Sequence, residues 1–364
     1  MSAVRRPLRI ESHAFAGNPA VLFPRFAMAC RCVCAVFGVV FVLMASSAVC
    51  AGKAFPDEAP PPPSGAPTTD VFGYKTAVIL GTVEGLTEYL PVSSTGHLIL
   101  ANEFLGLKNS AASPSPSGEN KVPSSLESAA DAYVIVIQFG AILAVLFAYW
   151  GRVRGLVFGL FAGKRESFLL TRNIVIAFLP AAFLGFLFNK HIEAVLFGVR
   201  PVIFALFTGA LVMLGVEFWY RRRRIAGKED GGGEGPEMHE LTASRALGIG
   251  VAQCFALWPG MSRSMVTICG GYLAGLRPAR ATEFSFLLGL VTLTCASVYK
   301  TIGSGGKMLA AFDLGPLVAG IVTATFTSFF AVKWMVGWIN RHGLSYFAWY
   351  RIVLAIALYI YFRP

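Results

Sequence analysis

The stretch between residues 84 and 97 gathers acidic, hydroxyl and imidazole side chains inside an otherwise apolar chain. Glu84 and Glu88 are four positions apart, so on a helix they share one face. Pro91 ends such a helix because it lacks an N–H donor and disfavours helical angles in the residue before it. A second helix is predicted to begin after Pro91, because Ser93, Ser94 and Thr95 are residue types that favour the start of a helix. The stretch therefore predicts a broken helix whose new N-terminus binds an anion, most commonly phosphate.

The composition places this stretch in a membrane. Of the 364 residues, 55% are hydrophobic and 14% are charged, and the mean hydropathy is +0.62. Soluble domains carry roughly 25% charged residues. The chain is therefore predicted to be an all-α polytopic membrane protein, and its net charge of +11 is interpreted as membrane topology. No nucleic-acid-binding module is recognisable, so no nucleic-acid partner is expected.

Residues 1–51 are interpreted as an N-terminal extension that contains a signal peptide. An apolar run at 33–49 follows Arg31 and ends in small residues, which favours cleavage after Ala51. An uncleaved anchor helix is the alternative, and translation from Met28 would give a shorter leader. Residues 52–72, with four consecutive prolines, are predicted to be a linker to the membrane domain at 73–364.

Six stretches of the membrane domain are long and apolar enough to be transmembrane helices. They are 131–150, 173–190, 199–219, 283–300, 314–338 and 346–362. Two further segments, 74–107 and 245–280, are apolar but interrupted by Pro, Gly and polar clusters. These two are predicted to be re-entrant helical hairpins, because irregular backbone within a membrane must lie inside the protein or line a cavity.

The two interrupted segments resemble each other, which indicates an internal repeat. A shift of 169 residues pairs Gly81 with Gly250, Glu84 with Gln253, Tyr89 with Trp258, Ser93 with Ser262, Ser94 with Arg263, and Thr95 with Ser264. The predicted units are repeat one at 73–220, a cytoplasmic linker at 221–244 and repeat two at 245–364. Interrupted segments at matching places in two halves are typical of a central binding site.

The basic residues predict the orientation of the repeats. They are Arg152, Arg154, Lys164, Arg165, Arg172, Arg221 to Arg224, Lys228, Arg277, Arg280, Lys333 and Arg341. Placing all of them in the cytoplasm satisfies the positive-inside rule and puts both ends of the membrane domain outside. An odd number of spans then separates the two interrupted segments, which predicts an inverted-topology repeat.

The second interrupted segment adds a positive charge to the predicted site. Residues 258–267 again break a helix and restart it with hydroxyl residues around Arg263. An unpaired Arg in a membrane is costly and is expected to meet an anion, and its planar fork matches phosphate oxygens. Two helix N-termini, one with Arg263 and one with His97, would form a cradle for diphosphate. Each side chain alone has a structural alternative, such as helix capping for the hydroxyls or an ion pair with a glutamate for Arg263.

The two clusters resemble those of the undecaprenyl-diphosphatase family, the bacitracin-resistance type of integral membrane phosphatase. The matching motifs are Glu84-x-x-x-Glu88, Pro91 to His97, Pro259 to Thr267, Gln138 to Val145, Glu283 to Leu288, and Tyr350-Arg351. The resemblance extends from about residue 73 to the C-terminus. It implies hydrolysis of undecaprenyl diphosphate to the monophosphate carrier of cell-wall synthesis, in the bacterial inner membrane, at a site that faces the periplasm. It also implies a divalent cation, Mg²⁺ or Ca²⁺.

The resemblance also implies roles for individual residues. Ser94 would be the nucleophile or would position one, Glu88 would be its base or a metal ligand, and Glu84 would support it as the second metal ligand. Arg263 would clamp phosphate. His97 would protonate the leaving oxygen, with a nucleophilic histidine as the rival assignment. Further substrate-binding candidates are Ser93, Thr95, Gln253, Ser262, Ser264 and Thr267.

A second class of function stays open from the sequence alone. Inverted repeats with broken helices at the membrane midplane are also a transporter architecture, so the alternative is a polyprenyl-phosphate transporter or flippase. A transporter needs Arg263 and a cavity, but it needs no nucleophile and base. A homodimer is left open as well.

Overall fold

The computed structural model describes residues 72–107, 124–225, 235–310 and 312–362. The predicted signal peptide, most of the first linker, much of the loop after the first hairpin and part of the central linker lie outside the described residues. The described part is helical throughout and contains no strand. Its helices are α3 (Tyr74–Thr87), α4 (Ser94–Phe104), α5 (Ser124–Ala148), α6 (Trp150–Phe161), α7 (Arg165–Leu196), α8 (Val199–Ile225), η1 (Met238–Glu240), α9 (Ala243–Cys254), η2 (Phe255–Leu257), α10 (Arg263–Leu273), α11 (Pro278–Ala310), α12 (Leu314–His342) and α13 (Ser345–Phe362).

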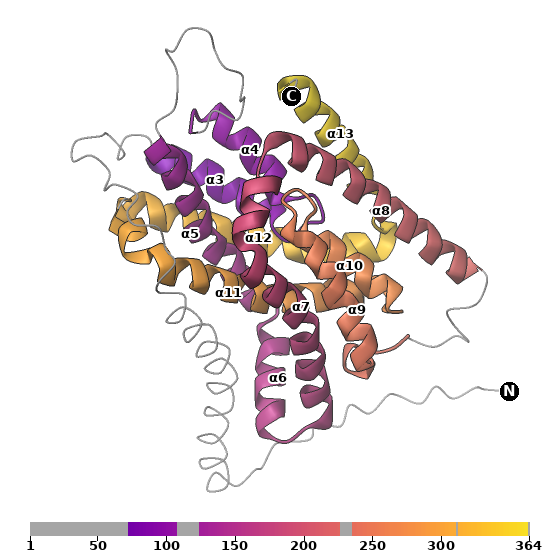
Figure 1. The fold of residues 1–364 in the computed structure, drawn as a ribbon. Coiled ribbons are helices and arrows are strands. Elements are labelled where there is room, and N and C mark those ends of the chain that lie inside the picture. The colour runs from indigo at the N-terminus through magenta and orange to yellow at the C-terminus, as the bar shows by residue number, and fades with distance from the viewer. Residues whose placement is uncertain (1–71, 108–123, 226–234, 311, 363–364) are drawn as a thin grey trace, which may run out of the picture.

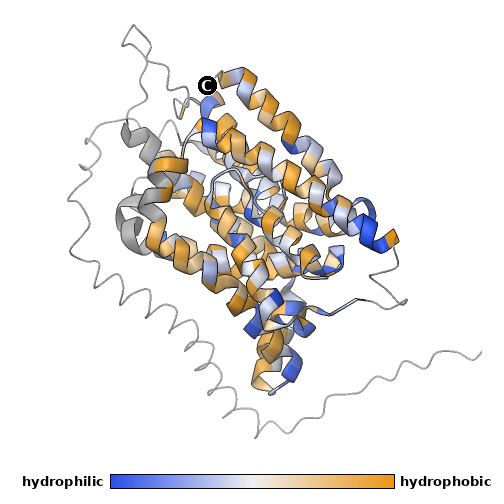
Figure 2. Ribbon diagram, turned by 45° about the vertical axis from the view of Figure 1, so that its right-hand side comes forward, coloured by the Kyte–Doolittle hydropathy of each residue, from blue (hydrophilic) through white to orange (hydrophobic). Residues whose placement is uncertain are grey.

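The long helices confirm a polytopic membrane protein. Five helices in the described part are long and apolar enough to cross a membrane, and a sixth span arises if α5 and α6 count as one element bent by 74°. Large apolar side chains such as Phe183, Phe204 and Phe326 remain exposed, and apolar residues colour the outer faces of the bundle in Figure 2. A surface of this kind is suited to lipid, because few soluble monomers expose so much apolar area.

Two boundaries differ from the prediction. Helix α6 begins directly after α5, so that Arg152 and Arg154, which follow the first predicted span, lie on a helix. Helix α8 continues to Ile225, so that the Arg221 to Arg224 run is helical and the central linker starts later than residue 221. Both differences arise where a helix continues past the apolar stretch into charged sequence.

The two interrupted segments are broken helices, as predicted. Helix α3 ends at Thr87 and α4 begins at Ser94, while α9 and η2 end at Leu257 and α10 begins at Arg263. The residue before each second helix has the same unusual backbone: Ser93 has φ 73° and ψ 103°, and Ser262 has φ 72° and ψ 112°. These are the only non-glycine residues with positive φ in the described part of the chain. The matching conformations, 169 positions apart, support the internal repeat, and its inverted orientation stays a prediction.

Each broken helix packs against a long helix of the other half. Helix α3 lies on α12, with Gly81 against the backbone of Gly320, and α9 lies on α7, with Gly250 against Ala177. A Cβ atom on Gly81 would lie 2.5 Å from Gly320 O, and one on Gly250 would lie 2.6 Å from Ala177 O. The equivalent glycines therefore allow both close approaches. This crossed packing brings the two breaks together near the centre of the bundle (Figure 1).

Candidate active site

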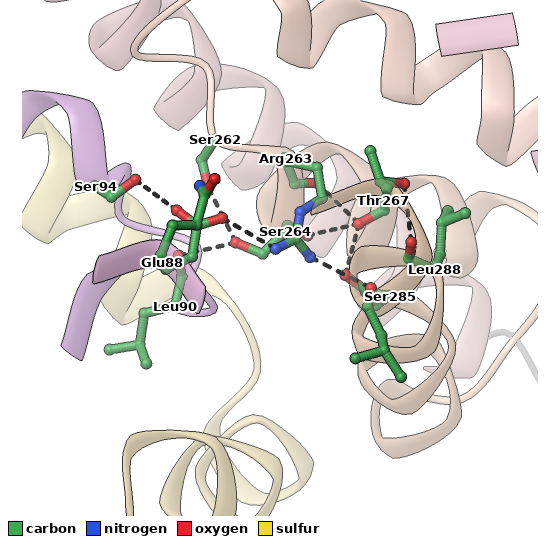
Figure 3. A network of polar contacts seen from close by, with 12 residues as sticks. Glu88, Leu90, Ser94, Ser262, Arg263, Ser264, Thr267, Ser285 and Leu288 are labelled. Carbon is green, nitrogen blue, oxygen red and sulfur yellow. Dashed lines mark hydrogen bonds and ion pairs between the residues drawn. The ribbon is translucent and has the colours of Figure 1, made fainter. Parts of the chain in front are cut away.

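An ion pair between the two broken helices forms the centre of the candidate site. Glu88 follows the last residue of α3, and Arg263 is the first residue of α10. Arg263 Nη2 lies 3.2 Å from Glu88 Oε1, and the two side chains are 9% and 8% exposed (Figure 3). Charges buried this deeply must be paired, because a lone charge in an apolar interior is strongly unfavourable. Arg263 thus forms the ion pair with a glutamate that was its structural alternative. This pair connects the two sequence clusters.

Ser94 is bound to the same carboxylate. Its Oγ donates a hydrogen bond of 2.8 Å to Glu88 Oε2, so Glu88 holds Arg263 with one oxygen and Ser94 with the other (Figure 3). Ser94 is also the first residue of α4, where backbone N–H groups have no partner within the helix. A hydroxyl that donates to a carboxylate, beside a guanidinium and a helix N-terminus, has the arrangement of a nucleophile with its base.

Three residues besides Glu88 surround the Arg263 guanidinium. Its Cζ lies 4.8 Å from the centre of the Tyr89 ring, and Nη1 donates to Ser285 O at 3.4 Å. Gly289 lies directly beneath the guanidinium, and a Cβ atom there would come within 2.6 Å of Arg263 Cζ. The Nε–H group is buried without a hydrogen-bond partner in the described structure. This leaves Arg263 with a donor for a bound phosphate oxygen.

The hydroxyls after Arg263 hold the two breaks together. Ser264 Oγ donates to Leu90 O at 2.9 Å and lies 3.0 Å from Ser262 Oγ. Thr267 Oγ1 lies 2.6 Å from Ser285 Oγ and donates to Arg263 O at 2.8 Å. Ser264 and Thr267 are fully buried. In this structure these two predicted substrate-binding hydroxyls make internal bonds, while Ser262 is partly exposed.

The His97 ring lies against Tyr350 of α13. Its Nδ1 lies 2.7 Å from Ser93 O, and its Nε2 lies 2.7 Å from the Tyr350 hydroxyl. A carbonyl oxygen only accepts hydrogen bonds, so Nδ1 carries the proton, and in the neutral ring Tyr350 donates to Nε2. The two rings are parallel within 6° at a centroid distance of 5.6 Å. His97 is therefore held in one tautomer by a residue 253 positions away.

Glu84 and Gln253 are buried without hydrogen bonds. Each is 1% exposed, and neither the Glu84 carboxylate nor the Gln253 amide has a partner in the described structure. No cluster of three His, Cys, Asp or Glu side chains that could hold a metal occurs among the described residues. Mg²⁺ is often held by one or two carboxylates together with substrate phosphates. The unpartnered Glu84 oxygens and the neighbouring Glu88 fit the protein half of such a site.

Arg351 on α13 ties the breaks to the helices around them. Its side chain is 0% exposed, and within the described part of the chain it pairs with no carboxylate. It donates to Gly260 O and Met261 O at 3.0 Å each, to Ala205 O at 3.2 Å, to Leu206 O at 3.3 Å and to Pro91 O at 3.5 Å. Broken helices leave carbonyls without partners, and this one guanidinium serves carbonyls from both breaks.

The remaining predicted residues contribute fewer side-chain contacts to the site. Ser93 supplies its carbonyl to His97, and the half-buried Thr95 makes no side-chain hydrogen bond recorded within the described structure. The sequence assigned no role to Tyr89, Ser285, Tyr350 or Arg351. An isolated Arg within the apolar final span is a signal for Arg351, because such residues are functional or paired. Ser285 and Tyr350 lie in two of the matching motifs, but the sequence does not indicate which residues they contact.

Comparisons with known proteins agree with the motifs. Residues 77–357 match the family described as "Bacitracin resistance protein BacA". The undecaprenyl-diphosphatase of Sorangium cellulosum is 43% identical over 78% of this chain and 85% of its own length. Undecaprenyl-diphosphatase 1 of Burkholderia lata is 43% identical over 77% of this chain and 92% of its own length. The undecaprenyl-diphosphatase of Bordetella avium is 37% identical over 80% of this chain and 98% of its own length. The chain belongs to the BacA family of bacitracin resistance proteins.

Proposed function

We propose that this protein hydrolyses undecaprenyl diphosphate to undecaprenyl phosphate and inorganic phosphate in the bacterial inner membrane. This reaction recycles the lipid carrier of peptidoglycan synthesis and gives resistance to bacitracin. The observation that carries the proposal is the contact of Glu88 with both Ser94 and Arg263, at 2.8 Å and 3.2 Å. The proposed base, Glu88, thus contacts both the proposed nucleophile and the proposed phosphate clamp. The relatives named as undecaprenyl-diphosphatases agree with it.

In the proposed reaction Ser94 attacks the terminal phosphorus. Its Oγ forms the new bond to phosphorus while the bond to the bridging oxygen breaks, and that oxygen leaves with its electron pair as undecaprenyl phosphate. Glu88 takes the proton from Oγ. Water then attacks the phosphoserine, phosphate leaves, and Oγ regains a proton. Arg263 and the α4 N-terminus stabilise the charge on the transferred group, which is the main requirement of phosphoryl transfer.

A divalent cation is proposed to bind at Glu84 and Glu88. It would be completed by oxygens of the diphosphate and would neutralise their charge. Chelation of divalent ions is expected to lower the rate of phosphate release by at least about tenfold, with recovery on adding Mg²⁺ or Ca²⁺. Glu84→Gln is expected to raise the cation concentration needed for half-maximal rate. A rate that is insensitive to chelation in the native protein would exclude the metal.

The Tyr350 hydroxyl is proposed to orient the His97 ring. In its imidazolium form this ring carries a second proton, on Nε2, which it would give to the leaving oxygen. Tyr350→Phe keeps the ring but removes the 2.7 Å hydrogen bond to Nε2. We expect kcat to fall about tenfold with little change in KM, because the proton donor is less well positioned. In a His97→Ala background the same substitution should have no further effect. An equal loss in both backgrounds would show that Tyr350 acts independently of His97.

The site is proposed to open to the periplasm. The basic residues of α6, α8 and the α12 C-terminus support this, since the positive-inside rule puts them on the cytoplasmic side. The homodimer remains a proposal that no contact of the single chain tests.

A reconstituted system separates the phosphatase from a transporter. Liposomes that contain the full-length protein are supplied with undecaprenyl diphosphate, and phosphate release and movement of labelled lipid between leaflets are measured together. We expect phosphate release by the native protein and none by Ser94→Ala. Lipid movement that persists in Ser94→Ala, without phosphate release by the native protein, would favour the transporter and contradict the proposal.

A further inference from the structure

A cavity lies near the C-terminal end of α8, away from the candidate active site. It has a volume of 530 Å³ and is bounded by the last turn of α8, the α12 C-terminus and the first residue of α11. Its charged lining consists of Glu217, Arg221, Arg224 and Arg341. Leu206, whose carbonyl binds Arg351, precedes Arg221 by 15 positions on α8. At 1.5 Å per residue the cavity is roughly 20 Å from that level of the bundle.

The acid of this cavity already has its partners. Glu217 is 4% exposed, its Oε1 accepts from Arg221 Nε at 2.6 Å, and its Oε2 accepts from Leu344 N at 3.1 Å. Arg221 Nη2 also donates to His342 O at 3.1 Å. The Glu217–Arg221 pair is therefore neutral and satisfied. It forms the floor of the cavity and offers no charge to other groups.

Two guanidinium groups in the cavity have no counter-ion among the described residues. Arg224 and Arg341 come from different helices, and neither makes an ion pair or hydrogen bond with any other described residue. Elsewhere Arg152 pairs with Glu283, and Arg280 pairs with Glu237. Two positive charges that line the same cavity repel each other unless an anion lies between them. The cavity thus has an excess of positive charge at a place shaped to hold a ligand.

Aromatic side chains place this cavity at the membrane surface. Trp338 stacks on His342 at a ring distance of 4.3 Å, and Tyr346 is 59% exposed beside them. On α8, Trp219 lies under Arg223 with 4.8 Å from Cζ to the ring centre. Trp and Tyr concentrate at the level of lipid headgroups. The hydrophilic end of α8 follows directly on apolar helix in Figure 2, which agrees with this depth.

We infer that this cavity binds the headgroup of an anionic phospholipid in the leaflet on the predicted cytoplasmic side. Arg224 and Arg341 donate to the phosphate oxygens, for which the guanidinium fork is well matched. The exposed Ile225 at the edge of the cavity contacts the glycerol and the first acyl carbons. A free phosphate would leave that side chain uncovered, so the lipid is favoured. Basic pockets between helices at this depth bind such headgroups.

The test measures lipid binding to the purified full-length protein by native mass spectrometry in a neutral detergent. The probes are dioctanoyl-phosphatidylglycerol, the zwitterionic dioctanoyl-phosphatidylcholine and inorganic phosphate. The variant R224Q/R341Q removes both unpaired charges. The control R154Q/R165Q removes two exposed charges of α6 and α7. We expect the native protein to prefer phosphatidylglycerol, R224Q/R341Q to bind it about tenfold more weakly or worse, and the control to bind it normally.

Three results would overturn the inference. Equal weakening in both double variants would mean that diffuse surface charge attracts the lipid. Unchanged binding in R224Q/R341Q would mean that the cavity holds no lipid. Displacement of the lipid by equimolar inorganic phosphate would identify free phosphate as the ligand. Phosphate release in neutral detergent should be unchanged in both double variants, so the inference and the proposed function fail separately.

Discussion

Replacing Glu88 with glutamine is expected to lower kcat for phosphate release by about a thousandfold or more. The amide cannot take the Ser94 proton, although it keeps the shape of the side chain. It also removes the negative charge that faces Arg263 at 3.2 Å in a nearly buried site. The guanidinium would then bind the diphosphate more tightly in the ground state, so KM is expected to fall or stay constant while kcat collapses.

Steady-state phosphate release by the purified variant measures this effect. Glu166→Gln is the matched control, because Glu166 is an exposed acid in the first turn of α7 and lies outside the site. The control should keep the native rate, and both variants should have native melting temperatures. A Glu88→Gln protein that retains more than a tenth of the native kcat would exclude Glu88 as the base.

Replacing Arg351 with methionine is expected to have the largest effect on stability. Five carbonyls accept hydrogen bonds from this guanidinium, and three of them belong to the breaks: Pro91, Gly260 and Met261. Methionine fills similar volume but donates nothing, so buried carbonyls lose their partner. Each buried carbonyl that is left without a donor costs about 1–3 kcal/mol. The breaks would then shift, and Ser94 and Arg263 would move apart.

Thermal unfolding in detergent tests this prediction. We expect Arg351→Met to lower Tm by at least about 5 °C or to prevent purification of folded protein. Arg351→Lys should be intermediate, because an ammonium keeps the charge but cannot reach carbonyls on several sides. Arg154→Met, on an exposed part of α6, is the control and should leave Tm unchanged. A native Tm for Arg351→Met would contradict the structural role.

The breaks could be predicted from the sequence because local rules determine them. Pro91 and Gly260 disfavour helical backbone within the two breaks, and hydroxyl residues favour the start of the helices that follow. Even so, α3 ends at Thr87, four residues before Pro91, and Ser93 makes no capping bond. The positive φ of Ser93 and Ser262 could not be predicted, because surrounding packing imposes it against the preference of serine.

The chemistry of the site was predicted in part. The sequence gives Glu88, Ser94 and Arg263 as candidates, since charged and hydroxyl residues stand out in an apolar chain. It does not give their partners. His97 bonds Tyr350 and Arg263 bonds Ser285, and these contacts depend on how α11 and α13 pack against the breaks. Such long-range contacts leave no periodic signal, so only the folded structure reveals them.

One cycle of variants tests most directly whether the two broken helices form a single phosphatase site. Phosphate release from undecaprenyl diphosphate is measured for the native protein, Ser94→Ala, Arg263→Ala and the double variant. We expect each single variant to lose about a thousandfold in kcat/KM and the double variant to lose hardly more, because residues that act as a unit are not additive. Losses that multiply in the double variant, or a native protein that releases no phosphate, would contradict the single site.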